Sequence, residues 1–275
     1  MIELPEAFTL AAQISKTISG KKITNVTAAY TPHKLVWYYG DPDQYASLLV
    51  GHSIDKTTAF GALVHIKVAD SAILFGDGVR LRFHDKGDTH PEKHQLLVEF
   101  EDLTAISASV QMYGGVGCFR DGELDNHYYQ AARETPSPLS KKFSEKYFAR
   151  LISAPDVQKL SAKAFLATEQ RIPGIGNGVL QDILFDARVH PKKKINTFSD
   201  KEKRSLFKST KAVLLEMSQQ GGRDTEKDLF GNPGGYETKL SKKTVGKPCL
   251  ECGSSISKEN YLGGSIYFCT KCQKP

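Results

Sequence analysis

Cys249-Leu250-Glu251-Cys252 and Cys269-Thr270-Lys271-Cys272 stand sixteen residues apart near the end of the chain. Each C-x-x-C pair lets one tight turn present two thiolates to the same ion, and two such turns on neighbouring strands complete a tetrahedral site. This spacing is typical of a zinc ribbon or zinc knuckle. Four thiolates leave no open coordination position, so we expect one structural zinc ion that takes no part in catalysis.

Two disulfides or four free cysteines are the alternatives to zinc. The chain opens Met1-Ile2-Glu3-Leu4-Pro5-Glu6, with carboxylates and a proline where a secretory signal would carry a positive charge followed by an apolar run. A secreted disulfide framework is therefore not expected. The fifth cysteine, Cys118, stands among glycines and is expected to be a small buried apolar residue.

A chain of 275 residues with 40 % hydrophobic and 25 % charged residues is long enough for two globular domains and a small zinc module. No apolar run approaches the ~18 residues that a membrane span needs, so we expect a cytoplasmic protein. The net charge of +6 favours an anionic partner, and the lysines are concentrated in the second half. Such a concentration is more often a solvated face, but beside a zinc module it favours nucleic acid.

Hydrophobic periodicity divides the chain into a β-rich first half and a helical second half. Apolar residues at spacings of three and four predict an amphipathic helix over residues 4–18 that begins near Pro5. Short alternating runs then indicate about seven strands and a β-sandwich. These runs cover residues 23–30, 35–39, 62–68, 72–75, 80–84, 95–100 and 105–110.

Thr135-Pro136-Ser137-Pro138 is typical of a linker between the two halves. Helices are expected beyond it at residues 141–152, 156–170, 177–187 and 199–219. Residues 219–247 are rich in glycine and charge, and we expect a mobile surface loop there.

Gly174 and Gly176 lie in the stretch R-I-P-G-I-G-N, residues 171–177, between two expected helices. A turn of this kind points backbone N–H groups outward at the start of the next helix, which suits an anion. Asn177 stands where an N-cap or a phosphate-contacting amide would lie. A plain helix connection explains the turn equally well. Lys163 before it and the basic segment after it favour a surface that grips a nucleic-acid backbone.

Three stretches occur in the order and spacing of one enzyme family: the opening Met1-Ile2-Glu3-Leu4-Pro5-Glu6, residues 165–191 with P-G-I-G-N and R-V-H-P, and residues 249–273 with C-T-K-C-Q. Together they resemble the formamidopyrimidine-DNA glycosylase and endonuclease VIII family of base-excision repair. The resemblance implies an α+β fold with three domains. These are an N-terminal β-sandwich with a flanking helix over residues 1–130, a helix-two-turn-helix domain over residues 136–225 and a zinc finger over residues 240–275.

The resemblance also implies a partner and a reaction. The partner is double-stranded damaged DNA, bound by a monomer associated with the nucleoid. In the family, an N-terminal proline amine attacks the sugar C1′ of a flipped-out damaged base, and a neighbouring glutamate handles protons. Glu3 occupies that glutamate's place and Glu6 the second acidic position. Ile2 stands in place of the proline, so the attacking amine would be that of Met1 or of Ile2. We therefore expect AP lyase activity to be weak or absent.

Other positions also depart from the family. Its strand lysine falls within residues 57–61, which hold no basic residue, and its finger arginine falls on Gly264. Asp77 replaces the void-filling methionine. The arginine and phenylalanine of the second void-filling loop align roughly with Tyr113 and Gly114.

Several basic residues are candidates to replace these contacts: Arg80, Arg82, Arg223, Lys242 and Lys243. Arg223 and Tyr236 stand where the family carries its loop for recognising the damaged base. Tyr236 would either stack on a base or anchor that loop.

The sequence thus predicts a DNA repair glycosylase in which Glu3 is the main acid–base residue and water or a primary amine is the nucleophile. A damaged- or structured-DNA binding protein that has lost catalysis is the alternative. Retention of Glu3 and Glu6 favours the enzyme. Loss of the proline, the strand lysine and the finger arginine favours the binding protein.

Overall fold

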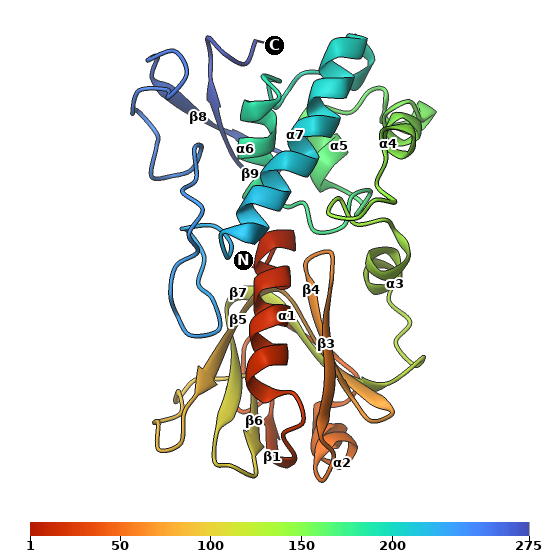
Figure 1. Ribbon diagram of the computed structural model, residues 1–275, viewed down its shortest axis with the longest axis vertical. Coiled ribbons are helices and arrows are strands. Elements are labelled where there is room, and N and C mark those ends of the chain that lie inside the picture. The colour runs from red at the N-terminus through yellow and green to blue at the C-terminus, as the bar shows by residue number, and fades with distance from the viewer. Residues whose placement is uncertain (275) are drawn as a thin grey trace. The chain divides into compact units, whose positions relative to one another are not determined.

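Helix α1 (Leu4–Ile18) carries Pro5 in its first turn, where a missing N–H costs no helical hydrogen bond. The backbone N–H of Glu3 donates to Oε2 of Glu6 at 3.1 Å and so caps the start of the helix. In the computed structural model, which describes residues 1–274, the apolar stripe of α1 packs against β3 (Ile54–Phe60) and β4 (Leu63–Val68) (Figure 1). The sequence prediction of this helix is confirmed.

The chain forms two compact units, and each unit consists of two separate segments of the sequence. One consists of Met1–Arg133 together with Gly221–Gly235, and the other of Glu134–Gln220 together with the chain from Tyr236 onward. The segment Gly221–Gly235 therefore returns to the N-terminal unit after the helices of the second unit. Among the described residues, no helix has the length and apolar character required to cross a bilayer.

A β-sandwich forms the N-terminal unit. Its strands are β1 (Ile23–Ala28), β2 (Val36–Tyr39), β3, β4, β5 (Ser71–His84), β6 (Leu96–Phe100) and β7 (Ala105–Arg120). They are hydrogen-bonded in the order β1-β6-β7-β5-β4-β3, with β2 parallel to β7. The two long strands β5 and β7 run through both layers and connect them (Figure 1).

The long strands differ from the predicted ones. Residues 72–75 and 80–84, expected as separate runs, form the single strand β5, with a register shift against β7 between Asp77 and Val79. Asp77 has a φ of 55°, which local patterning does not reveal. The sequence did not predict β3, nor the helices α2 (Tyr45–Leu49) and α3 (His127–Glu134).

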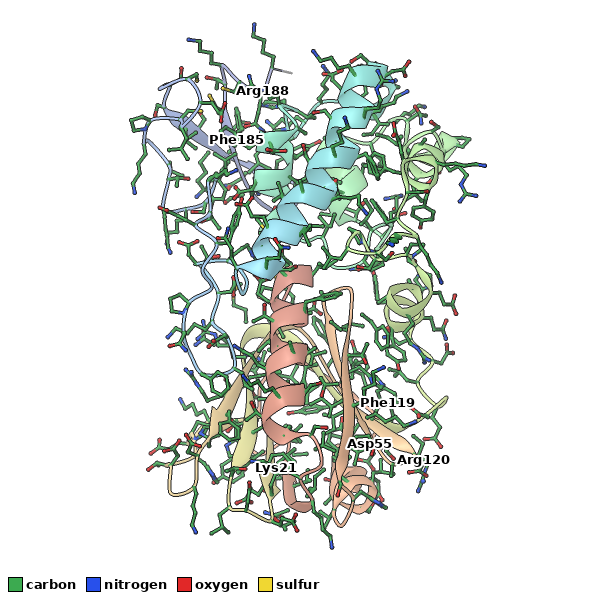
Figure 2. All side chains as sticks on the ribbon, in the orientation of Figure 1. Lys21, Asp55, Phe119, Arg120, Phe185 and Arg188 are labelled. Atoms are coloured by element: carbon green, nitrogen blue, oxygen red, sulfur yellow. The ribbon has the colours of Figure 1, made fainter. Side chains whose placement is uncertain are left out.

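Four helices and a hairpin build the second unit. They are α4 (Glu145–Ile152), α5 (Ala162–Ala167), α6 (Val179–Asp186), α7 (Asp200–Gln219), β8 (Ile256–Tyr261) and β9 (Gly264–Cys269). The helix predicted over residues 156–170 is shorter because Ser161 caps α5, its hydroxyl accepting from the backbone N–H of Ala164. Phe185 of α6 packs in the apolar cluster of the cysteine module, and Arg188 just beyond it pairs with Glu251 (Figure 2).

Residues 219–247 contain no helix or strand beyond the end of α7, as predicted. The expectation of a surface loop is nevertheless wrong at four side chains, Arg223, Leu229, Tyr236 and Leu240, which are at most 3 % exposed. The N–H of Leu229 donates to Oε1 of Gln13 at 3.0 Å, which ties the segment to α1. The segment is anchored to its units by buried side chains rather than by secondary structure.

Candidate functional site

A buried guanidinium faces the two glutamates at the start of α1. Nε and Nη2 of Arg223 donate to the carboxylate oxygens of Glu6 at 2.9 and 2.7 Å, and Nη1 lies 3.6 Å from Oε2 of Glu3. All three side chains are at most 5 % exposed. Burial alone would lower the pKa of Arg223, but the charges of Glu3 and Glu6 outweigh it and raise that pKa. The guanidinium is therefore charged, and it pairs with both glutamates inside the N-terminal unit.

Met1 is held beside this cluster by three polar contacts. Its ammonium pairs with the carboxylate of Glu226. Its carbonyl oxygen accepts from Nη2 of Arg223 at 3.2 Å, and its Sδ accepts from the hydroxyl of Tyr113 at 3.2 Å. Met1 is 43 % exposed, whereas Ile2 is 5 % exposed and its peptide N–H donates to the carbonyl of Asp77. Of the two candidate amines, the one at the surface is that of Met1.

A cavity of about 190 Å³ lies next to the cluster, within the N-terminal unit. Four segments line it: residues 1, 2 and 6, residues 78–80 of β5, residues 111–113 of β7, and residues 225–227. Asp77 precedes the second segment, and burial raises the pKa of its carboxyl. The charge of Asp77 in turn raises the pKa of Tyr113, after burial itself. The cavity thus combines the thioether of Met1, the phenol of Tyr113 and several charged groups.

In the second unit, Lys163 and Asn177 both bind the backbone of the β8–β9 hairpin. Nζ of Lys163 donates to the carbonyl of Tyr261 at 2.6 Å, and Nδ2 of Asn177 donates to that of Ser265 at 2.9 Å. Lys163 is 5 % exposed, and burial lowers its pKa. A Cβ on Gly264 would lie 3.4 Å from both Asn177 and Nζ of Lys163, so the glycine fits closely over these two side chains.

The turn before α6 is a tight glycine turn that leads into the helix, as the sequence predicted. Gly174 has a φ of 91°, a region that glycine enters at little cost. Gly176 accepts at its carbonyl from the N–H of Leu180 at 3.3 Å, which starts the helix. Gly178 rather than Asn177 is the N-cap, so the interpretation of Asn177 as a cap is wrong. The oxygen Oδ1 of Asn177 is buried and has no hydrogen-bond partner within residues 1–274.

Tyr236 is 2 % exposed, which suits the anchoring role that the sequence left open. Burial and then the neighbouring carboxylate of Asp182 raise the pKa of its hydroxyl. Asp182 accepts from the backbone N–H groups of Lys239 and Leu240 at 2.9 and 2.8 Å. Burial raises the pKa of Asp182 to about 6 despite these donors. A short buried network therefore fixes the chain just before the cysteine module.

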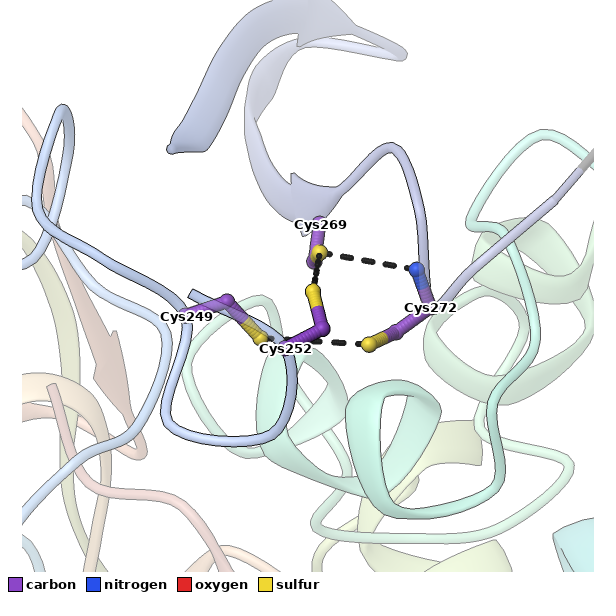
Figure 3. Close-up of side chains that lie close together, drawn as sticks. All are labelled: Cys249, Cys252, Cys269 and Cys272. Atoms are coloured by element: carbon purple, nitrogen blue, oxygen red, sulfur yellow. Dashed lines mark hydrogen bonds between the residues drawn. The ribbon is translucent and has the colours of Figure 1, made fainter. Parts of the chain in front are cut away.

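The four predicted metal ligands meet at the base of the hairpin (Figure 3). The sulfur atoms of Cys249, Cys252, Cys269 and Cys272 all lie within 4.8 Å of one another. The Sγ atoms of Cys252 and Cys269 are 3.4 Å apart, and those of Cys249 and Cys272 are 3.9 Å apart. A tetrahedral ion with metal–sulfur bonds of about 2.3 Å places its ligands about 3.8 Å from each other. The four cysteines could therefore hold one metal ion.

Comparison with known proteins gives a consistent result. The family profile "Formamidopyrimidine-DNA glycosylase H2TH domain" matches residues 135–227. Formamidopyrimidine-DNA glycosylases of Listeria innocua and Bacillus licheniformis are 29 % and 27 % identical, each over the whole of both chains. The chain resembles formamidopyrimidine-DNA glycosylases along its whole length. Its fold matches that of the Lactococcus lactis Fpg, solved with DNA containing an abasic site, with a TM-score of 0.85, 23 % identity and coverage of 99 % of this chain and 100 % of the other.

The structure of this relative of the formamidopyrimidine-DNA glycosylases places the predicted site residues in two groups. Met1, Ile2, Glu3, Glu6 and Arg223 come together in the N-terminal unit. Lys163, Asn177, Gly174, Gly176, Tyr236 and the four cysteines belong to the second unit.

Sequence reasoning missed Glu226 and Gln181. Glu226 holds the Met1 ammonium from a position 225 residues away. Gln181 donates to the carbonyl of Ser265 at 3.1 Å and accepts from the N–H of Tyr267 at 3.0 Å. The pair Gly221-Gly222 before Arg223 was the available signal for a close backbone approach, because Gly222 lies against the Glu6 side chain. No local signal pointed to Gln181.

Proposed function

We propose that this chain is a DNA repair glycosylase that binds double-stranded DNA and releases a damaged base. The observation that carries the proposal is the pair Glu3 and Glu6 beside a cavity at the N-terminus, in a chain matched along its whole length by relatives named formamidopyrimidine-DNA glycosylase. Two carboxylates near a reacting sugar can stabilise the positive charge that develops as an N-glycosidic bond breaks.

Glu3 is the acid–base residue of this proposal. Water attacks the sugar C1′, the bond to the base breaks with its electron pair going to the base, and Glu3 accepts the proton of the water. Arg223 pairs with Glu3 and Glu6 and so fixes the positions of both side chains at the start of α1. Glu3 is 3 % exposed, so the side chains that cover it must move for a sugar and a water molecule to reach it.

We expect little nucleophilic attack on the sugar by the nitrogen of Ile2 or by the amine of Met1. The nitrogen of Ile2 is a peptide nitrogen that already donates to Asp77, and its lone pair is delocalised. The Met1 amine forms an ion pair with Glu226, and this contact must break before the amine can attack a sugar. We therefore propose hydrolytic base release with little AP lyase activity.

The second unit supplies the grip on the DNA backbone in this proposal. Gly174, Gly176, Asn177 and Lys163 form its contact surface, and the cysteine module beside them holds one zinc ion that stabilises the fold of the hairpin. We propose a monomer that acts in the cytoplasm on nucleoid DNA.

Base release from duplexes carrying single oxidised or ring-opened bases tests the function. We expect release by the wild type and a loss of about 100-fold or more in Glu3→Gln, because general acid–base catalysis contributes roughly 10²–10⁴-fold. Glu123→Gln is the control, because Glu123 is exposed. Borohydride treatment should trap little protein on abasic DNA. Tight binding of damaged duplex without release of any base by the wild type would refute the enzyme.

A DNA-binding protein without catalysis is the second candidate. One observation favours it: Arg223 neutralises both glutamates and closes the cluster to solvent. In that case Glu3→Gln and the wild type bind damaged duplex equally and neither releases a base.

A further inference from the structure

Helix α7 carries apolar side chains on two of its sides. One side is buried in the core of the second unit, as an amphipathic helix requires, and holds Leu206, Val213, Leu214 and Met217. On another side, Phe207, Lys211 and Leu215 follow one another at spacings of four residues and so form a ridge along the helix. Phe207 is half-buried and Leu215 is 46 % exposed. Exposed apolar residues gathered in one place mark a surface for another molecule.

Two cavities of the second unit share Phe207 as a common wall. The first, of about 210 Å³, also has Phe148 and Ile152 of α4 in its lining. The second, of about 290 Å³, has Leu139 and Leu215 in its lining. An apolar cavity of about 150 Å³ accepts a benzene ring, so each of the two can take one large apolar side chain. We call the two cavities together the α4–α7 groove.

Phe207 is held in place by two buried rings. Its ring stacks on that of Phe143, with centroids 6.1 Å apart and 18° between the planes, and its centroid lies 5.6 Å from that of Phe148. Phe143 and Phe148 are at most 2 % exposed. Lys211, which lines the second cavity, donates from Nζ to the carbonyls of Pro138 and Phe143 at 3.0 and 3.2 Å. The wall of the groove is therefore preformed, and a ligand need not order it on binding.

The charged residues of the α4–α7 groove are mostly basic. Its four basic lining residues outnumber the two acidic ones, Glu145 and Asp200. Asp200 is already paired with Lys203 at 3.7 Å. Arg204 and Lys208 are exposed, and across the described residues 1–274 neither has an ion-pair partner. The groove therefore offers two free cations to an acidic ligand.

This combination of cavities and cations suits an acidic peptide better than a nucleic acid. The backbone of a duplex presents phosphates and sugars, which bind cations but leave two apolar cavities empty. A peptide with carboxylates and large apolar side chains fills the cavities and pairs with the cations at the same time. Arg204 and Leu215 are eleven residues apart on α7, or about 17 Å, and about five extended residues span that length.

We propose that the α4–α7 groove is a docking site for an acidic segment of a partner protein, with two large apolar side chains of that segment as its anchors. The lining of the groove belongs to Glu134–Gln220 of the second unit, and none of it lines the cavity beside Glu3 and Glu6. The proposal therefore does not depend on the proposed function. Binding at the groove brings a second protein to this chain without occupying the candidate site.

The anisotropy of a fluorescein-labelled peptide, Asp-Leu-Asp-Asp-Phe-Asp, titrated with the full chain tests the groove. We expect saturable binding that weakens as salt is added, because exposed charges are screened. A peptide with alanine in place of leucine and phenylalanine should bind about 10- to 150-fold more weakly, the range expected for one lost buried apolar side chain. Leu215→Asp should weaken binding of the first peptide about 10-fold, and Lys208→Glu about 5-fold.

Lys201→Glu is the matched control, since Lys201 is an exposed lysine of α7 that lines neither cavity. Equal affinities of Lys208→Glu and Lys201→Glu for the peptide, or equal binding of the two peptides by the wild type, would overturn the proposal. So would weaker binding of duplex or single-stranded DNA by Lys208→Glu than by Lys201→Glu, because the groove would then contact phosphate. A wild-type dimer in sedimentation that Leu215→Asp dissociates would assign the groove to a second copy of the chain and reject the partner.

Discussion

Replacing Arg223 by methionine removes the guanidinium and keeps an unbranched side chain of similar length. Glu6 then loses the donors at 2.9 and 2.7 Å, and Glu3 loses the cation at 3.6 Å. Both carboxylates remain buried, at 5 % and 3 % exposure. Removing one partner of a buried ion pair costs about 3–5 kcal/mol, because the remaining charge is uncompensated. With a urea dependence of about 2 kcal/mol per molar, the unfolding midpoint should fall by about 2 M.

Urea unfolding followed by Trp37 emission measures this loss, since Trp37 lies in the same unit as the cluster. Two buried carboxylates without a cation bind protons more readily in the folded than in the unfolded state, so the stability of Arg223→Met should fall as pH rises. The deficit is therefore expected to be smaller at about pH 5 than at about pH 8.

Arg120→Met is the control for this experiment. Arg120 pairs with Asp70 at 2.6 Å, but the two side chains are 53 % and 67 % exposed. Such a pair contributes about 0–1 kcal/mol. If the midpoint of Arg223→Met falls no further than that of Arg120→Met, the guanidinium does not compensate Glu3 and Glu6 in the folded protein.

Three further predictions concern the second unit. Cys269→Ser should abolish binding of one zinc ion per chain, measured by metal analysis after dialysis; retention of a full equivalent of zinc would contradict the four-thiolate site. Asp182 has a pKa raised from 3.8 to about 6, so the stability linked to it is present below about pH 4 and lost as pH rises through about 6. Asp182→Asn should therefore flatten the dependence of the thermal midpoint on pH in this window, and an unchanged slope would refute the assignment. Lys163→Met should release zinc to a chelator faster than Lys194→Met, because Lys163 holds the carbonyl of Tyr261 in the hairpin while Lys194 binds that of Lys159; equal rates would show that Lys163 does not support the finger.

Local spacing determined much of the fold in advance. The C-x-x-C pairs require two turns that face one ion, and the structure brings their sulfur atoms together. Apolar residues at helical spacing, with Pro5 in the first turn, required α1. Both features depend only on the geometry of neighbouring residues, and for that reason they can be deduced from the sequence. The long strands β5 and β7 were predicted only in part, because glycines and a positive φ at Asp77 interrupt the pattern while long-range pairing continues through them.

The partners and the burial of the charged side chains in the candidate site could be learned only from the tertiary structure. Arg223 reaches Glu6 across 217 positions of sequence, and Lys163 reaches Tyr261 across 98. A basic residue in a sequence is equally consistent with a solvated surface, a phosphate contact or a buried partner. Burial decides among these, because a charge removed from water must be matched by an opposite charge or by hydrogen bonds. The sequence by itself named the family motifs, the four cysteines that could hold a metal ion, and the glutamates. Only the folded chain shows that an arginine holds those glutamates, and that the lysine and asparagine proposed to contact phosphate also bind the backbone of the β8–β9 hairpin.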